Sequence, residues 1–172
     1  MKILTISGST RPESANVRLL ATLPGLFPEH TFTFYAQLSY LPIFKAEIDK
    51  YPWHAEIVNW RTAVRTADAI IFSTPEYIHN MPALLKNALE WLTSSGELAQ
   101  KRVLAMTFSP RKPRGEKAMQ SLLWSLQALD ANVVVQLPLY QDEINFTKRG
   151  QLIENESSEM LKAAIHLLMD VF

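Results

Sequence analysis

The chain has 172 residues, of which 48% are hydrophobic and 20% are charged, a composition that suits one domain around a single core. Basic and acidic side chains balance at 17 each, so no overall charge draws the protein to nucleic acid or to a membrane surface. The absence of cysteine excludes disulfides, thiolate catalysis, iron–sulfur clusters and cysteine zinc sites, and we expect no metal site.

Short apolar runs alternate along the chain with longer segments of helical periodicity. Strands are predicted at residues 2–7, 31–35, 69–74, 102–108 and 132–137. Helices are predicted at residues 14–23, 54–66, 81–95, 115–129 and 157–171. Asn80 is predicted to cap the third helix, with Pro82 in its first turn, where a missing N–H costs nothing. The alternation predicts βαβ units, a parallel sheet and one domain over residues 1–172.

Two segments interrupt this alternation. Residues 36–53 are rich in proline and aromatic residues and are predicted as a surface loop with at most one helical turn. Residues 138–154 are predicted as the connection into the last helix.

No stretch of the chain approaches the roughly 18 apolar residues that span a bilayer, and the start shows no signal peptide. We therefore expect a cytoplasmic protein.

The loop after the first strand has the composition of an anion site. It lies in "SGSTRPESANVRLL", residues 7–20. Ligands of an open parallel sheet bind beyond the carboxyl ends of the strands, and a helix starting near Ser14 would direct free N–H groups there. The side chains of Ser9, Arg11 and Asn16 can donate further hydrogen bonds to a phosphate. The standard dinucleotide and nucleoside-triphosphate fingerprints are absent, and an ordinary hydroxyl-rich helix cap is the alternative interpretation.

Two further loops follow the third and fourth strands. In "STPEYIHNMPALLKNALEWL", Tyr77 can lie against an aromatic ring or be an ordinary half-buried aromatic residue. The Glu76 carboxylate can fix the loop conformation, and His79 is expected to be an exposed loop histidine. In "FSPRKPRGEK", a basic cluster is either solvated or contacts the phosphates of a second nucleotide; it comprises Arg111, Lys112 and Arg114.

Together, the first two loops resemble the motifs of the NADPH-dependent FMN reductase family, which includes quinone, chromate and azo-dye reductases. The first motif is matched by Gly8, Ser9, Arg11, Ser14, Asn16 and Leu19. The second is matched by Pro75, Glu76, Tyr77, Pro82, Leu85, Lys86, Asn87, Ala88 and Trp91, with Glu90 in the acidic place. The resemblance, which covers the chain to about residue 135, implies a flavodoxin-like α/β sandwich with a five-stranded parallel sheet of order 2-1-3-4-5 and helices on both faces.

The resemblance further implies FMN as the cofactor and NAD(P)H as the co-substrate. It assigns phosphate contacts to Ser9, Arg11, Ser14 and Asn16. The remaining predicted cofactor-binding residues lie on the second and third loops: Pro75, Glu76, Tyr77, Ile78 and Ser109. Because bound FMN would carry the chemistry, hydride transfer to a quinone-like or other small electron acceptor, no catalytic side chain is predicted.

The sequence departs from the family pattern at three places, and two other functions stay open. Ile78 stands where the family has asparagine, Ala83 follows the motif proline in place of glycine, and the third loop has only Gly115. A flavodoxin-type electron carrier is disfavoured by the balanced charge and by Arg11. A flavin-free structural or regulatory dimer gains some support from Ile78 and the altered third loop but is the weaker alternative. Relatives form dimers or tetramers, so a homodimer or homotetramer is expected, and Trp91 either belongs to a partner surface or packs against the sheet.

Overall fold

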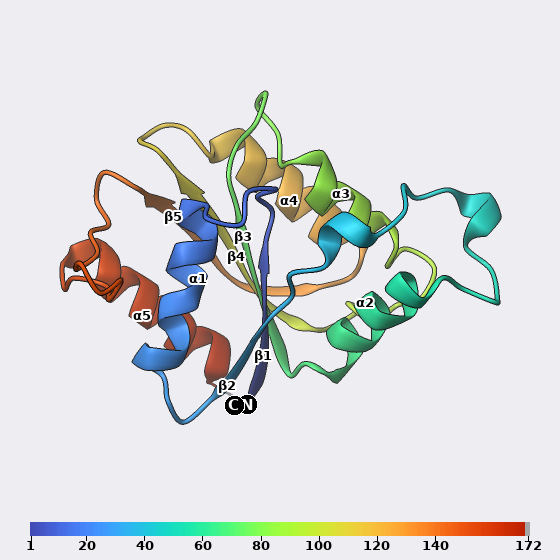
Figure 1. Cartoon of the computed structure of the whole chain (residues 1–172), viewed down its shortest axis with the longest axis horizontal. Coiled ribbons are helices and arrows are strands. Elements are labelled where there is room, and N and C mark those ends of the chain that lie inside the picture. Colours follow the sequence, from blue (N-terminus) through green and yellow to red (C-terminus); the bar gives the residue numbers. More distant parts are fainter. Residues whose placement is uncertain (171–172) are drawn as a thin grey trace.

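The computed structural model describes residues 1–170 as a three-layer α/β sandwich with a five-stranded sheet in the middle (Figure 1). All neighbouring strands are parallel, in the order β2-β1-β3-β4-β5. This order confirms the predicted flavodoxin-like arrangement. The strands are β1 (Lys2–Ser7), β2 (Thr31–Phe34), β3 (Ala69–Thr74), β4 (Arg102–Ser109) and β5 (Asn132–Tyr140).

Helices cover both faces of the sheet and divide the core into two layers (Figure 1). Trp60 and Phe72 lie in the larger layer, and Phe108 lies in the other. β3 is buried on both faces over its whole length, which explains its continuous apolar sequence. The first layer is covered by α2 (Ala55–Thr66), α3 (Ala83–Glu90) and α4 (Glu116–Ala128), and the second by α1 (Ala15–Leu26) and α5 (Glu156–Met169).

The predicted helix over residues 81–95 is too long at both ends. Asn80 does not cap α3, because its N–H and C=O bond to Tyr77 in a hairpin; Pro82 occupies the N-cap position instead. At the other end α3 stops before Trp91, and a segment of turns follows up to Gly96, which has a φ of +73°. The threonine and serines of that segment are weak helix formers, which explains the early end.

Other boundaries differ by smaller amounts. β5 runs on to Tyr140, so the first residues of the predicted connection 138–154 are strand. Pro138 is tolerated there because β5 is an edge strand. The loop 36–53 contains two short 3₁₀ turns rather than one. Residue 171 of the predicted last helix lies outside the described residues, and no helix of the described chain is long and apolar enough to cross a membrane.

Candidate cofactor site

The first loop, residues 8–14, is held tightly against the end of β3. The Gly8 N–H donates to the Ser73 carbonyl at 2.8 Å, and a Cβ on Gly8 would lie only 2.8 Å from Thr74 Oγ1. Glycine therefore permits the close approach of this loop to β3. Ser14 is the N-cap of α1, and its Oγ accepts from the Val17 N–H at 3.2 Å. The predicted helix start near Ser14 is confirmed.

Free hydrogen-bond donors lie on this loop and at the start of α1. Within residues 1–170, no acceptor lies at the N–H of Ala15 or of Asn16, in the first turn of the helix. Arg11 is exposed, and its guanidinium takes part in none of the ion pairs of the described chain. The Arg11 N–H donates to Ser9 Oγ at 3.3 Å, which keeps that hydroxyl in the same turn. The helix dipole and the guanidinium together suit a phosphate.

The side chain of Asn16 supports the first loop from within the fold. It is buried, its Oδ1 accepts from Ser73 Oγ at 2.7 Å, and its Nδ2 donates to the Phe108 carbonyl at 3.1 Å. These bonds tie α1 to the carboxyl ends of β3 and β4. The Asn16 side chain is therefore engaged within the fold, and the donor that Asn16 leaves free is its backbone N–H.

The second loop turns in a tight hairpin between β3 and α3, and in Figure 1 it projects beyond the sheet. Tyr77 and Asn80 exchange backbone hydrogen bonds of 2.9 and 3.0 Å. The two residues between them, Ile78 and His79, have φ values of +51° and +55°, and positive φ at both central residues is typical of a type I′ hairpin turn. Tyr77 is 44% exposed and Ile78 is 98% exposed. His79 is exposed, as predicted.

Glu76 joins the second loop to the third. Its Oε2 accepts from the N–H groups of Gly115, Lys117 and Ala118, at 3.1, 2.9 and 3.2 Å, at the start of α4. The positive end of the helix dipole favours a carboxylate at this position. Glu76 thus fixes the loop conformation, as its place in the sequence suggested, while the preceding Pro75 is buried.

The third loop begins over two buried hydroxyl groups. Thr107 and Ser109 are buried, and neither hydroxyl has a hydrogen-bond partner within the described residues. Both face Gly115, whose φ is +105°: a Cβ there would lie 2.8 Å from Ser109 Oγ and 3.0 Å from Thr107 Oγ1. Glycine is thus needed at this turn on two grounds, conformation and space.

The basic cluster of the third loop is exposed, and none of its three side chains forms an ion pair with a described residue. Lys112 lines a cavity of about 850 Å³ that the carboxylates of Glu116 and Glu143 share. Those carboxylates disfavour a second anion beside Lys112. Arg111 and Arg114 lie outside that lining and are the better candidates for an anion contact.

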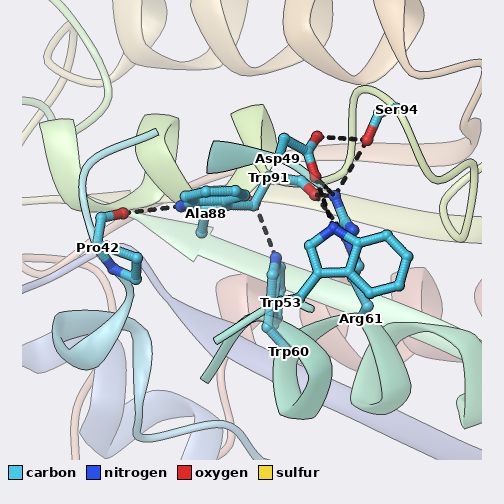
Figure 2. Close-up of polar contacts among 8 residues, drawn as sticks. All are labelled: Pro42, Asp49, Trp53, Trp60, Arg61, Ala88, Trp91 and Ser94. Carbon is cyan, nitrogen blue, oxygen red and sulfur yellow. Dashed lines mark hydrogen bonds and ion pairs between the residues drawn. The ribbon is translucent and has the colours of Figure 1, made fainter. Parts of the chain in front are cut away.

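The loop 36–53 is fastened to α2 by a buried ion pair (Figure 2). Arg61 Nη2 donates to Asp49 Oδ1 at 2.8 Å, and the Arg61 guanidinium also donates to the Trp91 carbonyl at 2.9 and 3.0 Å. Ser94 and Trp53 donate to the same carboxylate. Burial raises the pKa of Asp49, but the hydrogen bonds from Ser94 and Arg61 and the Arg61 charge outweigh it and leave the pKa below its usual value.

Two buried tryptophans complete this anchor (Figure 2). The indole N–H of Trp91 donates to the Pro42 carbonyl, and that of Trp60 donates to the Ala88 carbonyl, both at 2.8 Å. Trp91 is fully buried, so of its two interpretations packing within the fold is confirmed and a contact surface for a partner is excluded. Its ring packs edge-on against the ring of Phe44 in the loop 36–53, with 5.0 Å between the ring centroids.

A small cavity of about 230 Å³ separates this loop from the first one. Ser9 and Arg11 line it on one side, and Tyr35 and Ser39 line it on the other. Burial, and then the charge of Glu56, raise the pKa of the Tyr35 phenol, so it stays neutral at physiological pH. The phenol therefore adds no negative charge near Arg11.

Sequence reasoning missed the Asp49–Arg61 pair and Thr107. One signal was present: Ile57, Trp60, Arg61 and Val64 share one face of α2, so a charged residue interrupts an otherwise buried stripe. A buried arginine needs an acceptor, but the sequence does not say which carboxylate supplies it.

Comparison with known proteins gives a consistent result. Residues 1–142 match the family model described as NADPH-dependent FMN reductase. An NAD(P)H-dependent FMN reductase of Pseudomonas aeruginosa is 27% identical, covering 98% of this chain and 93% of that protein. A quinone reductase of Escherichia coli K12 is 30% identical, covering 78% of this chain and 73% of that protein. An NAD(P)H:acceptor oxidoreductase of Paracoccus denitrificans, 18% identical, superimposes with a TM-score of 0.79 over 98% of this chain and 95% of that one.

Proposed function

The chain belongs to the NADPH-dependent FMN reductase family, and we propose that it passes a hydride equivalent from NAD(P)H to a quinone-like or other small electron acceptor by way of FMN held between its first three sheet-edge loops. The observation that supports this proposal most directly is the set of free hydrogen-bond donors at the start of α1. There, the free N–H groups of Ala15 and Asn16 lie in the same loop-and-helix start as the Arg11 guanidinium.

The residues present fit this cofactor. Ser9, Arg11, Ser14 and Asn16 would hold the phosphate, Asn16 through its backbone. The buried, unpartnered hydroxyl of Ser109 offers a polar contact near the third loop, where a bound group could satisfy it. The ring-side residues would then be Pro75, Glu76, Tyr77 and Ile78, with Glu76 acting by holding the hairpin in place.

When bound, FMN supplies two-electron transfer between the two substrates. The role of the protein in this chemistry is to orient the cofactor, and the hairpin and the third loop would form the sides of its site. The N–H groups of Ile78 and His79 bond to no acceptor within the described residues. Such donors stabilise negative charge at the edge of a ring placed beside them. For a quinone acceptor the balance is one hydride from NAD(P)H and one proton from solvent.

The test is reconstitution of the purified protein with FMN, followed by absorbance spectroscopy and NADPH consumption with menadione. We expect a stoichiometric flavin spectrum and sustained NADPH oxidation without any added reductase. An electron carrier would bind FMN but fail to oxidise NADPH, and a flavin-free dimer would remain colourless. Either result would refute the proposal.

The phosphate assignment has its own test. Arg11→Ala should weaken FMN binding by about 1.5–3 kcal/mol, the scale of a hydrogen bond to a charged group, with no loss of folding stability. Arg65→Ala is the matched control, because Arg65 is also exposed but lies at the far end of α2, beside Lys101. An unchanged FMN affinity in Arg11→Ala would contradict the assignment.

The exposed basic cluster supports a preference for NADPH over NADH through the 2′-phosphate. Arg111 and Arg114 are the proposed contacts, since Lys112 shares its cavity with carboxylates. The expected result is a lower kcat/KM for NADPH, but not for NADH, in Arg111→Ala and Arg114→Ala. Equal kcat/KM for the two nucleotides in the unaltered protein would remove this proposal.

We also propose a homodimer or homotetramer that works in the cytoplasm. Trp124, 64% exposed on α4, offers a large apolar ring that self-association would bury. Light scattering of the protein and of Trp124→Ser tests the assembly. Cell fractionation tests the compartment.

A further inference from the structure

Ile78 combines two unfavourable features at one position. Its side chain is 98% exposed, more than any other large hydrophobic residue of the described chain. Its φ of +51° is one that β-branched residues rarely adopt, because Cβ crowds the backbone. Asparagine or glycine would be the low-energy choice at this place in a hairpin. A residue that gains no burial and strains the backbone needs another reason to be there.

The hairpin base explains how the strained turn persists. Tyr77 and Asn80 close the turn with two backbone hydrogen bonds, and Asn80 Oδ1 also accepts from the Met81 N–H at 2.8 Å. Glu76 fastens the entry of the hairpin to three N–H groups of the third loop and α4. Strained backbone survives where the surroundings over-determine it, and such residues cluster at ligand sites. The tip is therefore presented in a fixed position at the sheet edge.

The chemistry of the tip restricts what it can bind. An isoleucine side chain offers only apolar surface, and the half-exposed ring of Tyr77 beside it extends that surface. A charged or strongly hydrated acceptor would lose water against the isoleucine side chain without gaining a hydrogen bond from it. An uncharged aromatic acceptor would bury apolar area against both side chains.

Resting on the proposed function, we propose that Ile78 selects the electron acceptor: its apolar tip favours uncharged, alkyl-substituted quinone rings over charged acceptors.

The experiment compares Ile78→Asn, Ile78→Val and the unaltered protein, each loaded with FMN. The acceptors are menadione, an uncharged alkylated quinone, and ferricyanide, a charged acceptor. In Ile78→Asn we expect the ratio of kcat/KM for menadione to that for ferricyanide to fall about fivefold to twentyfold, the scale of one partly buried isoleucine. Ile78→Val keeps an apolar β-branched side chain and should keep the ratio within about twofold. Ile43→Asn, at another exposed isoleucine in the loop 36–53, is the matched control.

Two readouts do not depend on turnover. Thermal unfolding of the FMN-free chain should shift upward by about 2–4 °C in Ile78→Asn but not in Ile78→Val, because asparagine relieves the backbone strain. Equilibrium dialysis should show weaker menadione binding to Ile78→Asn than to the unaltered protein.

The outcomes separate this proposal from the one beneath it. A protein that binds no FMN or oxidises no NADPH refutes the proposed function, and dialysis with menadione still tests Ile78. An unchanged acceptor ratio with unchanged menadione binding overturns the role of Ile78 alone. A loss of FMN affinity that accounts for the whole change in ratio also overturns it, since the Ile78 side chain would then act on the cofactor and not on the acceptor.

Discussion

Two carboxylates fasten two loops of this molecule, and their partners differ in kind. Asp49 holds the loop 36–53 by accepting from side chains, chief among them the buried cation Arg61 (Figure 2). Glu76 holds the hairpin by accepting from three backbone N–H groups at the start of α4. The Asp49 anchor is a buried ion pair, whereas the Glu76 anchor is a carboxylate that is hydrogen-bonded to uncharged backbone N–H groups.

The difference decides what each anchor leaves behind when it is lost. Removing one member of a buried ion pair strands the other charge away from water. Removing a carboxylate from a helix N-terminus leaves only neutral N–H groups, which water can reach more easily. The loop 36–53 therefore depends on charge balance, whereas the hairpin depends on hydrogen bonds. Four sets of measurements test this contrast.

The largest effect is expected from Asp49→Ala. The change leaves the Arg61 charge buried, with neutral acceptors as its remaining partners, and should lower the free energy of unfolding by about 3–5 kcal/mol. Urea unfolding followed by tryptophan fluorescence measures it. The control is the double variant Asp49→Leu, Arg61→Met, which removes both charges and should recover much of the loss. A double variant as unstable as the single one would contradict the account.

Glu76→Ala should lower the free energy of unfolding by less, about 1–3 kcal/mol, because it removes three hydrogen bonds to a charged acceptor without stranding a charge. Glu76→Gln keeps one carbonyl acceptor and should lose roughly half as much. Urea unfolding of the two variants gives the comparison. Equal losses in both would mean that the negative charge at α4, rather than its hydrogen bonds, holds the hairpin.

Much of the fold and of the first loop could be predicted because local signals agree there. Apolar runs marked β3 and β4, and Ser14 both follows the loop and caps α1. The hydroxyl groups of Ser9 and Ser14 and the Arg11 side chain lie in the short connection between β1 and α1, so the two elements determine their position. Local propensity and tertiary structure point the same way, so the sequence was sufficient.

The hairpin turn and the partners of the two anchoring carboxylates could not be predicted, for different reasons. Ile78 at positive φ contradicts local propensity, so the pattern instead suggested Asn80 as a helix cap. The partners of Glu76 lie some forty residues away on α4, and Asp49 finds Arg61 only once a long loop folds back. Such contacts depend on tertiary placement, which no periodicity encodes.

The pH dependence of stability should separate the two anchors further. The pKa of Asp49 is lowered in the folded protein from its ordinary value of 3.8. Its contribution is therefore fully present above that value and is lost as the pH falls through the lower, folded-state pKa. Between neutral pH and strong acid, the unaltered protein should lose stability more steeply than Asp49→Asn. Urea unfolding over pH 2–7 tests this expectation, and parallel curves for the two proteins would contradict it.

The smallest effects concern the outer contact of each carboxylate. Trp53 donates its indole N–H to Asp49 at 3.1 Å, and its ring lies 5.4 Å from the Arg61 guanidinium. Trp53→Phe keeps a ring but removes the donor and should cost about 0.5–1 kcal/mol of unfolding free energy. His79 Nδ1 lies 3.6 Å from Glu76 Oε1, but the His79 side chain is mostly exposed. His79→Ala should therefore change the free energy of unfolding by less than about 0.5 kcal/mol. If His79→Ala cost more than Trp53→Phe, the hairpin anchor would owe its strength to charge after all, and the contrast between the two loops would fail.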